Sequence, residues 1–228
     1  MADMRKIIRS SKKILCLVIL VSTAIASTAQ QDSAVNLPNF LFPGFTKSTI
    51  KLKSGQFSAA VLNYNVVDQE MVFQQNGGYM VLSNPQLVDT VYIANRTFIP
   101  FKVGFYELVM TGPLTLFIQH KSDVESVGTP TGYGATSQTS NSSYQRQIYG
   151  PAGSVDLRIP DGYKIVDKTD YWVRKNDLME KFSTKRQFLK IFKDKEKELT
   201  KFIDDKNIKF REVNDIVMLF NYCNELYN

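Results

Sequence analysis

Histidine and cysteine are scarce in this chain, which has one histidine and two cysteines among 228 residues. Cys16 lies in the leader described below, so Cys223 is left as a single thiol, which cannot form an intrachain disulfide. His120 would have to serve any histidine-dependent catalytic triad, yet no Gly-x-Ser-x-Gly motif accompanies it. We expect His120, which ends an apparent strand beside Lys121, to be solvated.

Metal and cofactor motifs are also missing. With one histidine and one cysteine, mainly carboxylates are left as ligands, and no Asp-x-Asp-x-Asp-Gly calcium loop is present. The glycines around Gly132 lack the following lysine and helix of a phosphate-binding loop. We therefore predict no catalytic residue, no metal site and no cofactor.

Only the start of the chain has the composition of an export signal. A basic head is followed by an apolar run from Ile14 to Ile25 and then by small residues. Cleavage is expected after Ala29, at Ser27-Thr28-Ala29 rather than Ala24-Ile25-Ala26, because polar residues follow it directly. The run is too short for a membrane anchor, and Cys16 is too early in it for lipidation. We predict a signal peptide over 1–29, no transmembrane segment after it, and a location in the periplasm, at the cell surface or outside the cell.

Basic charge is concentrated in this leader. It holds five of the 28 Lys and Arg residues and one of the 22 Asp and Glu residues, so the remainder is almost balanced. A nucleic-acid-binding protein needs a persistent basic face. The composition therefore argues against nucleic acid as a partner.

The central part of the chain has the pattern of short antiparallel strands. After a linker over 30–46, runs rich in Val, Ile, Tyr, Phe and Thr alternate with turn residues such as Asn76-Gly77-Gly78. A last hairpin is predicted across Asn176-Asp177. We predict an α+β protein whose β-rich domain, over 47–182, is a sandwich or barrel of about eight to twelve strands.

A segment rich in Gly, Ser and Thr interrupts this domain at 122–154. A loop of this length is usually functional or disordered. Its large side chains are Tyr133, Tyr144, Arg146 and Tyr149, and Tyr and Arg recur at binding surfaces. These four residues are the candidate binding residues.

The last part, 183–228, has helical periodicity. Ser183 or Thr184 is expected to cap a first helix and Asp194 a second. The third helix has one apolar face, formed by Val213, Ile216, Val217, Phe220, Cys223 and Tyr227. We predict a three-helix C-terminal module packed on the β-rich domain, with Cys223 as a buried and inert thiol.

Several stretches, among them Leu62-Asn63-Tyr64-Asn65, Asp89-Thr90-Val91-Tyr92-Ile93 and the helical tail, resemble uncharacterised exported proteins of Bacteroidetes. The resemblance implies an envelope address in a Gram-negative cell and carries no activity. It also implies O-glycan attachment at Asp-Ser/Thr-aliphatic triplets. Asp32-Ser33-Ala34 matches this pattern, which makes Ser33 the candidate acceptor.

Two functions remain open on these grounds. The first is an exported, non-enzymatic module that binds an envelope protein or a glycan. The alternative is a hydrolase of an extracellular polysaccharide or cell-wall polymer that uses carboxylates alone, with Asp68 and Glu70 as the obvious pair.

Overall fold

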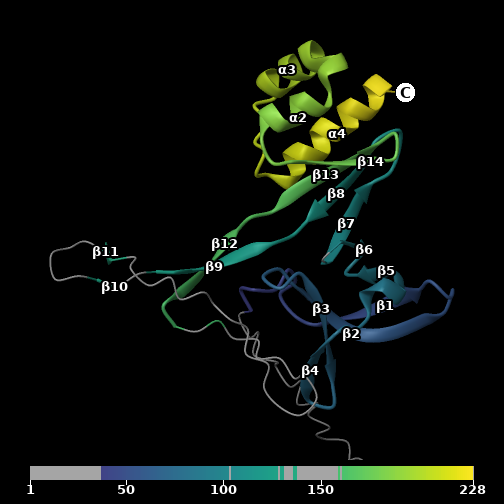
Figure 1. Cartoon of the computed structure of the whole chain (residues 1–228), viewed down its shortest axis with the longest axis vertical. Coiled ribbons are helices and arrows are strands. Elements are labelled where there is room, and N and C mark those ends of the chain that lie inside the picture. The colour runs from purple at the N-terminus through teal and green to yellow at the C-terminus, as the bar shows by residue number, and fades with distance from the viewer. Residues whose placement is uncertain are drawn as a thin grey trace, which may run out of the picture. The chain divides into compact units, whose positions relative to one another are not determined.

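The computed structural model describes residues 37–102, 104–127, 159 and 161–227, together with the backbone of two short strands. The fold is α+β, as predicted. A ten-stranded antiparallel sheet has the order β14-β13-β8-β7-β6-β5-β1-β2-β3-β4, and three α-helices follow it in the chain (Figure 1). Among the described helices, none is both long and apolar enough to cross a membrane.

The sheet is built mainly from hairpins. Its strands are β1 (Thr46–Leu52), β2 (Phe57–Asn65), β3 (Glu70–Gln75), β4 (Gly78–Val81), β5 (Val88–Ile93), β6 (Arg96–Phe101), β7 (Gly104–Met110), β8 (Thr115–Gln119), β13 (Asp170–Lys175) and β14 (Leu178–Phe182). A short 3-10 helix, η1 (Pro85–Leu87), precedes β5.

The turns explain why these hairpins close where they do. Asn176 and Asp177 both have positive φ, at 51° and 62°, and β13 pairs with β14 across them as predicted. Asn76 and Gly77 also have positive φ angles, and they join β3 to β4. Two successive positive φ angles match the right-handed twist of the flanking strands, and Asn, Asp and Gly tolerate them best.

The segment predicted as a loop from residue 122 begins with a strand. Ser122–Ser126 forms β9, which pairs antiparallel with β12 (Tyr163–Asp167). Only one aliphatic residue, Val124, lies in β9, so its sequence has little strand character. Backbone pairing and ion pairs, such as Lys168 with Asp123 and Glu125, hold it instead. A further pair, β10 (Thr129–Pro130) and β11 (Thr136–Ser137), lies farther along this segment.

The sheet bends so that its inner face encloses a first core. Strand β3 comes close to β7, and Tyr64 Oη on β2 lies 3.2 Å from the carbonyl oxygens of Phe105 and His120. The enclosed side chains, here called the sheet core, are Phe42, Ile50, Leu62, Tyr64, Val66, Met71, Val88, Val91, Ile93, Phe98 and Phe105. Phe42 comes from the predicted linker and is buried, so the end of that linker is part of the fold.

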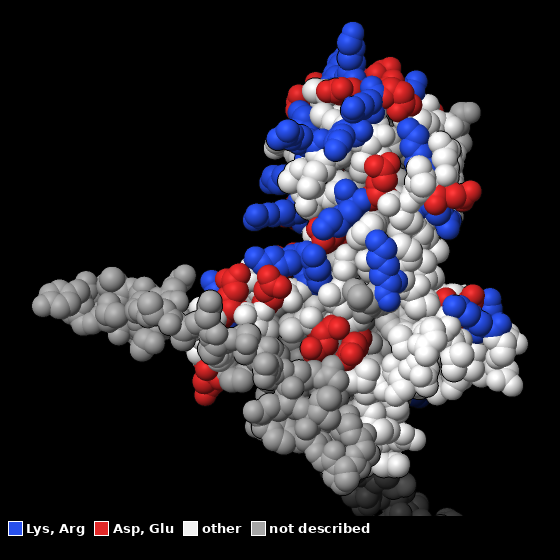
Figure 2. Space-filling view, viewed as in Figure 1, with Lys and Arg blue, Asp and Glu red and all other residues white. Residues whose placement is uncertain are grey.

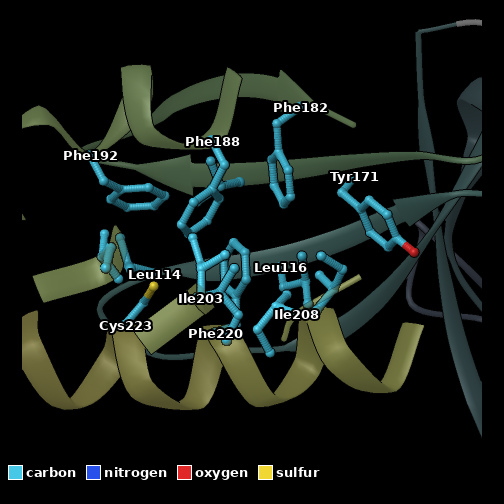
Figure 3. Packing of buried hydrophobic residues seen from close by; sticks show 14 of the residues in the cluster. Leu114, Leu116, Tyr171, Phe182, Phe188, Phe192, Ile203, Ile208, Phe220 and Cys223 are labelled. Atoms are coloured by element: carbon cyan, nitrogen blue, oxygen red, sulfur yellow. The ribbon is translucent and has the colours of Figure 1, made fainter. Parts of the chain in front are cut away.

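The helices cover the inner face of the other end of the sheet. They are α2 (Lys185–Ile191), α3 (Glu196–Asp205) and α4 (Val213–Tyr227), and they lie beside β8, β13 and β14 (Figure 1). In the second core, Phe182 and Phe188 approach Phe220 of α4 at centroid distances of 5.8 and 6.0 Å (Figure 3). The helical module is therefore docked on the sheet through large aromatic side chains.

Two details of the helical module test the predicted caps. Thr184 caps α2, since its hydroxyl oxygen accepts a hydrogen bond from the Gln187 backbone N–H at 3.3 Å. The prediction for Asp194 is wrong. It lies in a 3-10 turn, η2 (Lys193–Lys195), and its carboxylate binds Lys175 and Tyr227. A carboxylate engaged by these two groups is not available to the first amides of α3.

Candidate functional site

The outer face of the sheet, opposite the helices, carries an aromatic cluster. Residues directly opposite each other on neighbouring strands point to the same face. Trp172 of β13 is paired with Phe117 of β8, and their neighbours Tyr171 and Ile118 face the helices. Phe101, Tyr106, Phe117 and Trp172 are here called the outer aromatic face, with Ile99 and Leu108 beside them.

Three of these rings contact one another closely. The Trp172 centroid lies 5.5 Å from that of Tyr106 and 6.0 Å from that of Phe101, and the last two rings are 5.0 Å apart. Tyr106 is buried, whereas Trp172 and Phe101 are half-buried. Burial raises the pKa of Tyr106 to about 12, with a smaller contribution from Asp170, so its hydroxyl is protonated at neutral pH. The cluster thus presents part of a rigidly supported indole ring to solvent.

A chain of amide hydrogen bonds fixes the edge of Trp172. Its indole Nε1 donates to Gln119 Oε1 at 3.0 Å, and Gln119 Nε2 donates to Gln69 Oε1 at 2.6 Å. Gln69, in the turn after β2, has a positive φ of 58° and packs its backbone against Gly104. A Cβ at Gly104 would lie 2.8 Å from the Gln69 carbonyl oxygen, so only glycine fits there.

Charged side chains surround these aromatic rings. Asp170 is buried and contacts Lys121 at 2.6 Å and Lys181 at 3.3 Å. Lys102, which is exposed, places Nζ 4.9 Å from the Trp172 ring and 5.4 Å from the Phe101 ring. This is the geometry of a cation–π contact. The outer aromatic face therefore combines stacking surface with amide, carboxylate and ammonium groups.

A second polar cluster lies on the inner face. Glu107 of β7 is buried, and its carboxylate accepts hydrogen bonds from Arg96 of β6 and from His120, whose Nε2 lies 2.6 Å from Oε2. Burial acts to raise the Glu107 pKa, but these two partners outweigh it and lower the pKa below its ordinary value. The Arg96 guanidinium also lies over the rings of Phe42 and Phe98, at 5.3 and 5.5 Å.

The expectation of a solvated His120 is therefore wrong. The residue is only 8% exposed and is held by Glu107. Its place at the end of β8 suggested exposure, but the bend of the sheet brings β6 and β7 around it. Arg96, Glu107 and His120 are far enough apart in sequence that only the strand register brings them together.

Of the residues singled out from the sequence, Asp68 accepts a hydrogen bond from Asn65 Nδ2 at 2.8 Å, and Glu70 is the first residue of β3. Ala29, Ser33 and the four candidate binding residues Tyr133, Tyr144, Arg146 and Tyr149 all lie outside the described residues. The outer aromatic face was missed, although a signal for it exists. Tyr171 and Val173 supply the buried face of β13, so the intervening Trp172, the only tryptophan in the chain, has to point away from that core.

Within the described parts of the chain, no three or more His, Cys, Asp or Glu side chains gather in a way that could hold a metal ion. Comparisons with models of protein families, with curated proteins and with solved structures find no match to this chain.

Proposed function

We propose that this protein is an exported, non-catalytic binding module of the cell envelope or the secreted fraction, and that its outer aromatic face binds a glycan. The observation that carries the proposal is the half-buried Trp172 ring, packed against Tyr106 and fixed at its edge by Gln119. A flat ring of this kind offers apolar area to the C–H face of a sugar ring, and it loses little side-chain entropy on binding because it is already ordered.

The groups around the ring suit the hydroxyl groups of a sugar. Lys121 and Lys181 carry ammonium groups, each with three donors, and the buried Asp170 carboxylate holds both of them near the ring. A sugar hydroxyl oxygen can accept a hydrogen bond from such an ammonium group.

Three carboxyl groups of the described residues lack the property that a general acid requires. Glycoside hydrolysis needs a general acid whose pKa is raised. Asp89, Glu107 and Asp194 all have lowered pKa values, because hydrogen bonds from Lys51 to Asp89, from Arg96 and His120 to Glu107, and from Tyr227 to Asp194 stabilise the ionised forms. None of these three carboxylates suits the acid role, and the hydrolase stays the second candidate.

Fluorescence offers a direct test, because Trp172 is the only tryptophan. The protein is titrated with soluble bacterial, plant and algal polysaccharides while indole emission is recorded. We expect a saturable change for at least one glycan class. Trp172→Ala should weaken binding of that glycan at least tenfold by calorimetry, and Trp172→Phe should retain part of it.

Phe57→Ala provides the control, because Phe57 is also a large apolar side chain on the sheet but is 66% exposed and lies on β2. The affinity of the Phe57→Ala variant for the glycan should equal that of the wild type. Equal affinity of the Trp172→Ala variant and the wild type would refute the assignment to this face. Release of reducing ends from a bound polysaccharide would favour the hydrolase instead.

Export is a separate part of the proposal and has its own test. Mass spectrometry of the protein recovered from its native host should find an N-terminus at Gln30, the residue after the predicted cleavage site. A mature protein that still begins at Met1 would contradict export.

A further inference from the structure

A basic cleft on the helical module lies apart from the outer aromatic face. It is lined by Lys185, Arg186, Leu189, Lys190, Lys193 and Glu196, and has a volume of about 520 Å³. These residues come from α2, η2 and the first residue of α3. The volume is within the usual range for small-molecule sites, roughly 300 to 1,000 Å³.

The cleft arises from the amphipathic pattern of α2. Phe188 and Phe192 point into the core, so the residues between them on the other side of the helix face outward. Arg186 and Lys190 are four residues apart on α2, which places them on one side of the helix, and Lys193 of η2 lines the same cleft. Leu189 is half-buried and adds an apolar surface to the cleft.

The charge of this cleft is not balanced from within. Among its four cations, only Lys185 has an ion pair in the described residues, with Asp204 of α3. Arg186, Lys190 and Lys193 are exposed and have none there, and Glu196 is the one carboxylate in the lining. In the view of Figure 2, charged side chains gather over the helical end of the molecule, with Lys and Arg interspersed with Asp and Glu, while much of the sheet is uncharged.

Like charges at helical spacing repel one another and lower the stability of an isolated helix. Here Arg186 and Lys190 of α2 line a cleft together with Lys193 of η2, which creates a local positive potential able to concentrate anions. Arg adds a planar fork of donors that matches phosphate oxygens, and Lys adds point charges. An anion with a single charge would leave most of this potential unmatched.

We infer that the cleft formed by Arg186, Lys190 and Lys193 binds a ligand that carries two or more phosphate groups. The ligand reaches the cleft either as a free polyphosphorylated molecule or as the headgroup of an anionic phospholipid. Both sources share the recognised chemistry. The inference rests on the charge and shape of the helical module and is independent of glycan binding at the sheet.

Calorimetry with sodium tripolyphosphate tests the free source. Co-sedimentation with vesicles that contain cardiolipin, whose headgroup carries two phosphate groups, tests the membrane source against phosphatidylcholine vesicles. We expect wild-type protein to bind at least one of these probes, with an affinity that falls as salt rises. The double variant Arg186→Glu with Lys190→Glu should bind that probe at least tenfold more weakly.

The matched control is Lys47→Glu with Lys53→Glu, which makes the same change in net charge at exposed positions on and next to β1. It should bind as the wild type does. Because all four positions are exposed, both variants should keep the wild-type melting temperature. The neutral double variant, Arg186→Gln with Lys190→Gln, should lose less affinity for the probe than the Glu double variant does.

Binding of tripolyphosphate alone identifies a soluble ligand, and binding of anionic vesicles alone identifies a lipid headgroup. Either result supports the inference if the Arg186→Glu and Lys190→Glu variant loses binding of that probe and the Lys47→Glu and Lys53→Glu control keeps it. Equal losses in the two double variants would show that net charge alone drives binding and would overturn the inference. Failure of the wild type to bind either probe would do so as well.

Discussion

The indole nitrogen of Trp172 donates a hydrogen bond to the side-chain oxygen of Gln119, 3.0 Å away on the neighbouring strand. Gln119 in turn donates to Gln69, so a turn between two other strands contributes to holding the ring. The Gln119 amide accepts one hydrogen bond through its oxygen and donates another through its nitrogen, which fixes the orientation of this side chain. The outer aromatic face is therefore ordered before any ligand arrives.

Removing the middle of the relay should cost stability. Gln119 is only 7% exposed, so Gln119→Ala leaves the Trp172 N–H without its partner and should lower the free energy of unfolding by about 1 to 3 kcal/mol. Urea denaturation measures this. Gln86→Ala, at an exposed glutamine, should change the free energy by less than about 0.5 kcal/mol. Equal stability of the two variants would mean that the relay does not order the indole.

Lys102 covers part of the ring that a sugar would occupy. Lys102→Ala removes the ammonium group 4.9 Å from the Trp172 ring, so the indole becomes more solvated. We expect a red shift of tryptophan emission and, for the glycan found by titration, about a threefold gain in affinity, since a cation–π contact at an exposed site is worth about 0.5 to 1 kcal/mol. Lys47→Ala is the control. A Lys102→Ala variant with the wild-type emission spectrum would contradict this arrangement.

The helical module should be essential to the stability of the sheet it covers. Phe220 is fully buried and contacts Phe182, Phe188 and Phe192, so Phe220→Asp places an unpaired charge in the core. We expect a loss of more than about 4 kcal/mol, measured by thermal or urea denaturation. Met218→Asp is the matched control on the same helix, because Met218 is 46% exposed. An unchanged melting temperature for Phe220→Asp would mean that α4 is not docked.

Glu107 should make stability depend on pH in the acid range. Its pKa in the folded protein is lowered from the ordinary value of 4.5, because Arg96 and His120 outweigh the effect of burial. A lowered folded-state pKa means that its stabilising contribution is complete above about pH 4.5 and is lost as the pH falls through the folded-state pKa. Melting temperatures measured from pH 7 to pH 3 should fall more steeply for the wild type than for Glu107→Gln.

The Glu107→Gln variant should also be less stable than the wild type at neutral pH. Glu107→Gln leaves Arg96 without its counter-ion beside a buried site, and we expect it to lose about 2 to 3 kcal/mol of unfolding free energy at pH 7. Parallel pH profiles for the two proteins would show that Glu107 is not responsible for the acid sensitivity.

Local signals in the sequence predicted much of this fold. The Asn176-Asp177 hairpin, the Thr184 cap and the apolar face of α4 each depend on neighbouring residues, so turn chemistry and helical spacing were enough to find them. The Arg96, Glu107 and His120 cluster depends on the register of three strands and on the bend of the sheet. No local pattern encodes that register.

The candidate site, too, could be predicted only in part from the sequence. Trp172 had to face away from the core because its neighbours are buried, but its contacts with Gln119 and Lys102 come from other strands and turns. The basic cleft combines α2 with η2 and α3, and it depends on a chain reversal near Phe192 that the helical periodicity alone does not reveal. Strand β9 escaped prediction because its stabilising partners lie some forty residues later.

Cys223 should serve as a probe of the docked state of α4. Its thiol is fully buried, and this burial raises its pKa to about 12, so almost none of the reactive thiolate exists at pH 8. In a chain that starts at Gln30, where Cys223 is the only cysteine, native protein should react with a thiol-specific disulfide reagent only as fast as α4 opens. Addition of denaturant should give one equivalent of reaction at once.

The Met218→Asp variant should react as slowly as the wild type, because that change leaves the buried face of α4 intact. Phe220→Asp should react at least a hundredfold faster, since it weakens the packing that excludes the reagent. Rapid modification of the native wild type would mean that the thiol is accessible, and that the aromatic core does not hold α4 against the sheet in solution.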